Sequence, residues 1–275
     1  RPMRDGVIAD FDITESMLRH FIEKVTGHSF MIRPRIMVCI PSCITMVEQR
    51  AIQEAAEQAG ARSSYLIEEP LAAAMGAGLD ISEPYGSMVV DIGGGTTDVA
   101  VISLGGIVIS DSLRVAGDKF DEAIMDYIKK EFNLMIGERT AENIKMEVGA
   151  AFPEARHSKM NIRGRDLLTG LPKNIEVTTE QVSKALESSV VQIVDCVKEV
   201  LEKCPPELAS DIMDHGIILT GGGAMLYGLD ELIRKETQIS TSLAEDPLSC
   251  VALGTGRALE NIDKLDSKKS IAFWK

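Results

Sequence analysis

Short runs of apolar and β-branched residues alternate along the chain with segments whose apolar positions recur at helical spacing. The apolar runs predict buried strands over residues 36–40, 65–67, 89–92, 99–102, 107–113 and 217–220. Between them, capping-box spacings at Asp12–Glu15, Thr45–Glu48 and Thr178–Gln181 predict the starts of helices. This interleaving of strands and helices predicts an α/β fold.

The segment 89–102 predicts a strand, a tight turn and a second strand, with three consecutive glycines, Gly93 to Gly95, at the turn. A hairpin turn needs only one or two residues with positive φ, so three glycines indicate that backbone N–H groups approach a ligand closely. Asp91 before the turn and Thr96 and Thr97 after it add a carboxylate and two hydroxyls, which suit a phosphate chain with its Mg²⁺. The alternative is an ordinary hairpin with a glycine-rich turn.

A second triple glycine favours the ligand-binding interpretation. Gly221 to Gly223 follow the predicted strand 217–220 directly and precede a helix predicted around 229–235, which again fits close approach to a nucleotide. Glu68 and Glu69 stand at the end of another predicted strand, just before Pro70, where α/β folds place their chemistry. A carboxylate at a helix N-terminus is also simply stabilising, so a structural role for either glutamate stays open.

Composition narrows the function classes. A chain of 275 residues with 45% hydrophobic and 26% charged residues is typical of a soluble globular protein with one large or two medium domains. The net charge of −13 argues against a nucleic-acid partner. The five scattered cysteines indicate reduced intracellular thiols, and no apolar run has the length of a membrane span, so we expect a cytoplasmic protein.

One loop departs from this soluble pattern. Residues 28–35 combine three large apolar side chains, Phe30, Met31 and Ile32, with two arginines. Two interpretations are open. The loop either folds onto its own core, or it forms a short wedge that enters a bilayer while the arginines meet lipid headgroups.

Several motifs are specific enough to indicate a family. Residues 91–98 (DIGGGTTD) look like a second phosphate loop, residues 68–74 (EEPLAAA) like a first connecting helix, and residues 220–225 (TGGGAM) like an adenosine loop. Together with the segments 1–10, 117–123, 162–165 and 204–211, they resemble the MreB/Mbl family of bacterial actins. This family lies within the superfamily of actin, sugar-kinase and heat-shock-chaperone ATPases. The resemblance covers residues 1 to about 262.

The resemblance implies an actin-like ATPase fold, in which ribonuclease H-like duplicated mixed sheets flanked by helices form two lobes around a nucleotide cleft. We expect the remainder of the first lobe over 1–88, the second-lobe core over 89–150 and its small subdomain over 151–215. Residues 216–262 would return to the second-lobe core and supply a first-lobe helix, and 263–275 would be a flexible tail. The family's first phosphate loop, an Asp-x-Gly-Thr hairpin, is not in this sequence, so we expect the chain to begin after it.

The resemblance also assigns residues to an ATP and Mg²⁺ site. Glu69 and Thr96 would be the catalytic residues, with Glu69 positioning or polarising the attacking water. Thr96 would also hold the β- and γ-phosphates with Gly94 and Gly95, next to Gly93. Asp91 would hold Mg²⁺ through its water shell. The nucleoside side of the site would be formed by Asp118, Glu142, Asn143, Ile144, Lys145, Gly222, Gly223, Ala224 and Met225.

The function implied is ATP-dependent polymerisation of the protein with itself, accompanied by slow ATP hydrolysis. The filaments would lie at the inner face of the cell membrane, guide the cell-wall elongation machinery and maintain rod shape, with Phe30, Met31 and Ile32 as membrane contacts. The alternative is a sugar or acetate kinase of the same superfamily, which would need a substrate pocket between the lobes. A chaperone ATPase would need a peptide-binding domain after them.

Overall fold

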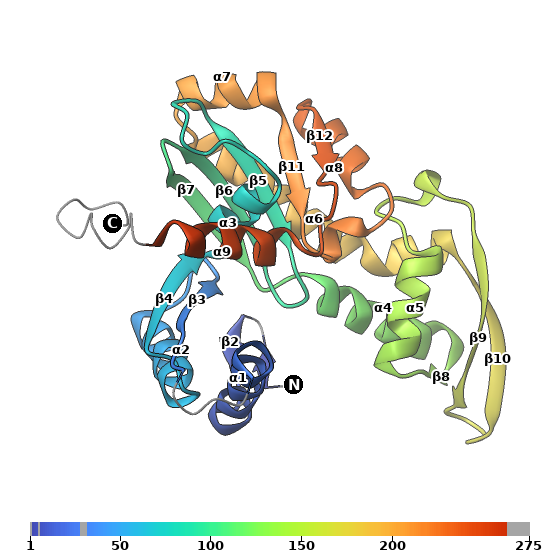
Figure 1. Cartoon of the computed structure of the whole chain (residues 1–275). Helices are drawn as coiled ribbons and strands as arrows, with labels where there is room; N and C mark the ends of the chain where they lie inside the picture. Colours follow the sequence, from blue (N-terminus) through green and yellow to red (C-terminus); the bar gives the residue numbers. More distant parts are fainter. Residues whose placement is uncertain (1, 5, 28–31, 263–275) are drawn as a thin grey trace.

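A five-stranded mixed sheet forms the centre of the molecule (Figure 1). The computed structural model describes residues 2–4, 6–27 and 32–262. The strand order is β12-β11-β5-β6-β7. As predicted, β5 (Ser87–Ile92), β6 (Thr97–Ser103) and β7 (Gly106–Leu113) form an antiparallel meander. By contrast, β11 (Ile217–Thr220) runs parallel to both β5 and β12 (Thr241–Leu243).

The two faces of this sheet belong to two hydrophobic cores. Val89 and Ala100 pack on one face with residues of α3 (Glu69–Gly76) and α9 (Cys250–Glu260). Val90 and Val99, on the other face, join a core that includes α4 (Gly117–Phe132), α6 (Thr179–Lys203), α7 (Pro206–His215) and α8 (Leu229–Thr237). Because both faces are covered, the central strands are continuous apolar runs rather than alternating ones.

The N-terminal part lies at one end of the sheet (Figure 1). Its elements are β1 (Met3–Arg4), β2 (Val7–Ile8), α1 (Phe11–Thr26), β3 (Arg35–Ile40), α2 (Met46–Gln58) and β4 (Ser63–Glu68), with β3 parallel to β4. The predicted capping box at Asp12 is wrong. Helix α1 begins two residues earlier than that spacing implies, because the Asp10 carboxylate accepts the Ile13 N–H at 3.1 Å. The capping boxes at Thr45 and Thr178 are confirmed.

A second small sheet lies beyond α4. The strands β8 (Leu134–Met135), β9 (Lys159–Asp166) and β10 (Pro172–Thr178) form an antiparallel sheet in the order β10-β9-β8. Helix α5 (Glu138–Val148) packs beside α4, and a short 3₁₀ turn, Pro153–Ala155, precedes β9. Strands β9 and β10 thus form an antiparallel hairpin within this part of the chain.

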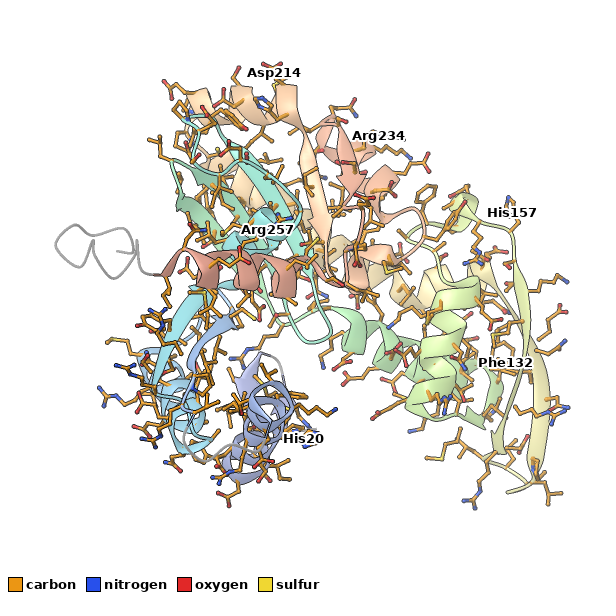
Figure 2. The ribbon with its side chains drawn as sticks, viewed as in Figure 1. His20, Phe132, His157, Asp214, Arg234 and Arg257 are labelled. Atoms are coloured by element: carbon orange, nitrogen blue, oxygen red, sulfur yellow. The ribbon has the colours of Figure 1, made fainter. Side chains whose placement is uncertain are left out.

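Helices α3 and α9 touch backbone to backbone. A Cβ atom on Gly76 of α3 would lie 1.8 Å from the carbonyl oxygen of Cys250, and one on Gly254 of α9 would lie 1.8 Å from that of Ala72. Arg257 of α9, labelled in Figure 2, donates a hydrogen bond to the carbonyl oxygen of Met75. Because α3 follows β4 without a loop, this tight pairing fixes the first residue of α3, Glu69, at the end of a helix that packs against β5 and β6 of the central sheet.

Candidate nucleotide site

The turn between β5 and β6 presents free backbone donors. The N–H of Gly93 donates to the carbonyl oxygen of Thr96 at 2.9 Å and closes the turn. The N–H groups of Gly94, Gly95 and Thr96 have no acceptor within residues 2–4, 6–27 and 32–262. Consecutive unpaired N–H groups at a turn form a concave site for an anion, and the glycines keep it open because they carry no Cβ.

The second glycine turn has the same property. Hydrogen bonds from Met225 and Leu226 back to the carbonyl oxygens of Gly222 and Gly223, at 3.3 and 3.2 Å, form one turn of 3₁₀ helix. In the described part of the chain, the N–H groups of residues 222–224 have no acceptor. The triple glycine thus leads into this 3₁₀ turn and not directly into α8, which begins at Leu229.

The two glycine turns, more than a hundred residues apart in sequence, lie against each other. A Cβ on Gly221, whose φ is +83°, would stand 2.3 Å from the carbonyl oxygen of Ile92. One on Gly223 would stand 2.6 Å from Cγ2 of Ile92 and 3.0 Å from the carbonyl oxygen of Gly93. Glycine is therefore required at 221 and 223 by contact between the turns. At Gly94 an added Cβ would meet only Asp118 Oδ1, at 3.8 Å, and Gly95 lines a cavity.

The first turn of α4 is hydrogen-bonded to the glycine turn between β5 and β6. The N–H groups of Gly117 and Asp118 donate to the carbonyl oxygens of Gly93 and Gly94 at 3.1 and 2.7 Å. The Lys145 ammonium reaches the same place from α5, donating to the Gly117 carbonyl at 3.1 Å and pairing with Asp121 at 2.9 Å. The structure thus brings the predicted residues Asp118 and Lys145 to the hairpin.

The other predicted residues of α5 and of the second turn differ in exposure. Glu142 and Asn143 are exposed. The side chain of Ile144 is fully buried in the core, so it is not available to a ligand. Ala224 is buried, whereas Met225 is 53% exposed beside a hollow of about 440 Å³. Of the predicted membrane residues, Ile32 is 54% exposed, and Phe30 and Met31 lie outside the described residues.

Carboxylates gather beside the hairpin. Burial raises the pKa of Asp91 to about 6, although a hydrogen bond from Thr220 opposes this rise. Burial, and after it the charges of Asp98 and Asp91, raises the pKa of Glu69 to about 8. Burial also raises the pKa of Asp98 and of Glu68. Within the described residues none of these four acids forms an ion pair with a basic side chain, so the cluster favours a bound cation.

The donor set fits a water-coordinated Mg²⁺. In the described part of the chain no three His, Cys, Asp or Glu side chains gather closely enough to bind a metal directly. Mg²⁺ keeps several waters and takes its remaining ligands from one or two carboxylates and from phosphates, so one buried carboxylate, Asp91, is a sufficient protein contribution. The Asp98 carboxylate is also fully buried, and its Oδ2 has no hydrogen-bond partner among the described residues.

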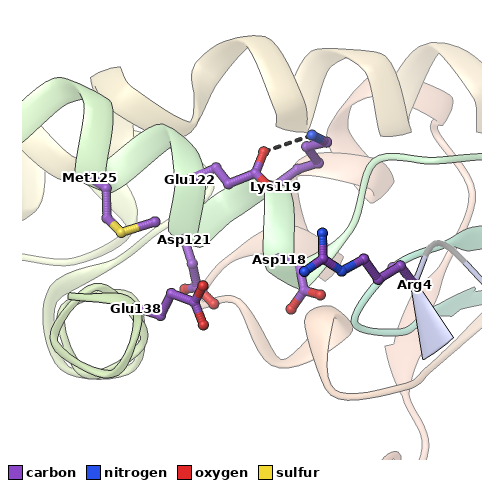
Figure 3. A pocket seen from close by; sticks show the side chains of 8 residues that line it. Arg4, Asp118, Lys119, Asp121, Glu122, Met125 and Glu138 are labelled. Carbon is purple, nitrogen blue, oxygen red and sulfur yellow. Dashed lines mark hydrogen bonds and ion pairs between the residues drawn. The ribbon is translucent and has the colours of Figure 1, made fainter. Parts of the chain in front are cut away.

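Three residues at the site were not identified from the sequence. Thr220 donates to Asp91 Oδ1 at 2.8 Å, and the Ser42 N–H donates to Asp98 Oδ1 at 2.9 Å from the loop after β3. Arg4 lines a cavity of about 320 Å³ together with Gly95 and Asp118 (Figure 3). Thr220 adjoins the second glycine turn, which is a usable signal. Arg4 lies in the segment 1–10, which supports the family resemblance but has no ligand-binding pattern, and Ser42 lies in a segment with no motif of its own.

Comparison with known proteins agrees with this architecture. The family model described as MreB/Mbl protein matches residues 1–267. The cell shape-determining protein Mbl of Bacillus subtilis (strain 168) is 55% identical over 269 residues, which are 98% of this chain and 81% of that protein. The cell shape-determining protein MreB of Escherichia coli (strain K12) is 55% identical over 264 residues, 96% of this chain and 76% of that protein.

Solved structures agree with the fold. The crystal structure of MreB5 of Spiroplasma citri bound to ADP superposes with a TM-score of 0.91 at 39% identity, over 97% of this chain and 80% of that one. The MamK double helical filament, at 21% identity, has the same fold, with a TM-score of 0.79 over 94% of this chain and 80% of that one. The central mixed sheet and its two glycine turns thus define an actin-like α/β protein.

The chain belongs to the MreB/Mbl family. This membership decides against the sugar- or acetate-kinase and chaperone alternatives. None of the helices in the described part is long and apolar enough to cross a membrane.

Proposed function

We propose that this chain binds ATP with Mg²⁺ between two lobes and polymerises into filaments at the inner face of the cell membrane. The filaments would guide the cell-wall elongation machinery and maintain rod shape. The observation that carries the nucleotide part is the contact between the turns at Gly93 and Gly223, each with three free N–H donors beside it. The 55% identical relatives are named cell shape-determining proteins, and MreB5 was crystallised with ADP and with AMPPNP.

The two turns would divide the nucleotide between them. The N–H groups of Gly94, Gly95 and Thr96 would bind the β- and γ-phosphates, since amide donors favour phosphate oxygens at a turn without side chains. The second turn would cover the α-phosphate and the adenine, with the exposed Met225 side chain available to contact the base. This division rests on the donors that the turns leave unpaired.

Asp91 and Glu69 would prepare the terminal phosphate for hydrolysis. Asp91 would hold Mg²⁺ through its water shell. The ion would offset the negative charge of the phosphates. With its pKa raised to about 8, Glu69 carries a proton for much of the time at neutral pH. It would therefore orient the attacking water through hydrogen bonds rather than act as a strong base, which fits slow hydrolysis that times filament turnover.

The α3–α9 pair would link nucleotide state to assembly. It joins β3 and β4 to the central sheet and places Glu69 at the junction. A nucleotide held by both lobes shifts the population toward closed protomers, and a filament built from closed protomers shifts it in the same direction.

Sedimentation and electron microscopy of the full-length protein with ATP and Mg²⁺ test the proposal. We expect Mg²⁺-ATP-dependent filaments, and we expect Glu69→Ala, which removes the group that orients the water, to form them while hydrolysing ATP about 100-fold more slowly. Glu147→Ala, at an exposed position on α5, is the matched control and should hydrolyse ATP normally. The absence of filaments with any nucleotide or lipid would contradict the proposal.

A further inference from the structure

The cavity of about 320 Å³ beside the phosphate hairpin has walls from two parts of the molecule. Gly95 and the first turns of α4 and α5 supply most of the lining. Arg4, in β1 of the N-terminal part, is the lining residue from outside the sheet-centred part. Figure 3 shows its side chain reaching into the cavity toward Asp118, at the place where α4 meets the hairpin. The cavity therefore lies between the two parts that the proposed nucleotide would join.

The Arg4 guanidinium is the uncommitted positive charge in this lining. The other basic lining residue is Lys119, whose ammonium pairs with Glu122 at 2.6 Å (Figure 3). Lys145, behind the cavity, is occupied by Asp121. The Arg4 side chain makes no hydrogen bond or ion pair with any other residue that the structure describes. A free guanidinium is a fork of five N–H donors, with the geometry that binds two oxygens of one phosphate or of neighbouring phosphates.

The remaining lining makes a positive contribution necessary. Four carboxylates line the cavity, those of Asp118, Asp121, Glu122 and Glu138, and two of them, Glu122 and Asp121, pair with Lys119 and Lys145. The acids outnumber these two lysines, so a polyphosphate seated on the N–H groups of Gly94 and Gly95 would be repelled by the excess negative charge. Backbone N–H groups carry only partial charges, so a full positive charge facing the hairpin would lower this repulsion most directly.

We propose that Arg4 is a phosphate-binding residue, contributed from the opposite side of the cleft to the nucleotide that the glycine turns hold. This inference rests on the proposed nucleotide site. Arg4 would favour a nucleotide that carries phosphates over a nucleoside that has none. The bound nucleotide would then connect β1 directly to the hairpin. The N-terminal part is then held toward the sheet when phosphates are present and released when they are not.

Calorimetric titration with Mg²⁺-ATP and, separately, with adenosine tests the assignment. In the full-length protein, we expect Arg4→Ala to weaken Mg²⁺-ATP binding roughly 10- to 100-fold, the usual range for hydrogen bonds to a charged group. Adenosine has no phosphate, so its affinity should not change. Arg4→Lys keeps the charge without the fork and should recover part of the loss.

Arg19→Ala is the matched control, because Arg19 is an exposed arginine bonded within α1 to Glu15 at 3.1 Å. It should bind Mg²⁺-ATP as the unaltered protein does. Unchanged Mg²⁺-ATP affinity in Arg4→Ala would overturn the inference. An equal loss of adenosine and Mg²⁺-ATP binding would overturn it too, since that result indicates a structural role. Failure of the unaltered protein to bind Mg²⁺-ATP would instead contradict the proposed function itself.

Discussion

The Thr220 hydroxyl donates a hydrogen bond of 2.8 Å to Oδ1 of Asp91, and the two residues face each other on the neighbouring parallel strands β11 and β5. Thr220 directly precedes the second glycine turn. Asp91 is the second-last residue of β5 and is separated from the first glycine turn only by Ile92. One buried hydrogen bond therefore connects the strands that carry both turns. It also holds the carboxylate proposed to face the Mg²⁺ water shell.

Replacing Thr220 by valine should destabilise the protein and weaken metal-dependent binding. Valine keeps the volume but removes the donor, so the buried Asp91 carboxylate loses its partner at a cost of about 1–3 kcal/mol. Its pKa should rise, because the hydrogen bond from Thr220 lowers it. Chemical denaturation should show the loss of stability, and nucleotide binding should require more Mg²⁺. Thr220→Ser retains the hydroxyl and should restore both; equal denaturation curves for valine and threonine would refute this prediction.

The backbone contact between α3 and α9 predicts a sharp difference between two glycines of one helix. Gly254→Ala places a Cβ 1.8 Å from the Ala72 carbonyl oxygen, so the helices must separate, and we expect a loss of about 2–4 kcal/mol. At Gly256 no atom lies within 4 Å of an added Cβ. Gly256→Ala should therefore be neutral or stabilising by up to about 1 kcal/mol. Thermal unfolding of both variants checks this, and similar melting temperatures would contradict the contact.

The raised pKa of Glu69 predicts a stability change with pH. Because the pKa rises from 4.5 to about 8 on folding, the folded state binds this proton more tightly than the unfolded state. Below about pH 4.5 both states are protonated and Glu69 has no effect. Between pH 4.5 and about 8 the unfolded state releases this proton while the folded state retains it, so stability falls as the pH rises through this range.

Glu69→Gln removes this penalty. The variant should match the unaltered protein at pH 4 and exceed its free energy of unfolding by on the order of 4 kcal/mol at pH 8. Denaturant titrations at the two pH values measure the difference, with the exposed Glu147→Gln as the control. The difference in free energy of unfolding between the variant and the unaltered protein should be larger at pH 8 than at pH 4. An equal difference at both pH values would show that folding does not raise the pKa of Glu69.

Membrane attachment is proposed to depend on the apolar residues 30–32. Replacing Phe30, Met31 and Ile32 by serine in the full-length protein should abolish sedimentation with liposomes, since many weak insertions along one filament add up through avidity. Replacing Met46 and Val47, which are 81% and 80% exposed on α2, by serine removes comparable apolar surface elsewhere and should leave sedimentation intact. Unchanged sedimentation of the triple variant would exclude this loop as the anchor.

The sequence alone determined the elements that depend on local chemistry. The apolar strands, the capping boxes at Thr45 and Thr178 and the Pro70 helix follow from neighbours within one turn or one strand, so periodicity predicts them. The glycine turns were recognisable for the same reason, since three consecutive glycines remove every Cβ from a loop. Asp10 and not Asp12 is the cap of α1, because Asp10 has the extended backbone of an N-cap and accepts the Ile13 N–H, whereas Asp12 already lies in the first turn.

Only the tertiary structure decided which of those elements contact each other. That Gly223 meets Gly93, that Thr220 holds Asp91 and that Gly254 meets Ala72 depends on parallel strand register and helix packing between distant segments. The pKa of Glu69 likewise depends on burial and on Asp98, which no local pattern fixes. Arg4 became a site residue because the fold carries β1 to the hairpin, and contacts at such sequence separation leave no periodic trace in the chain.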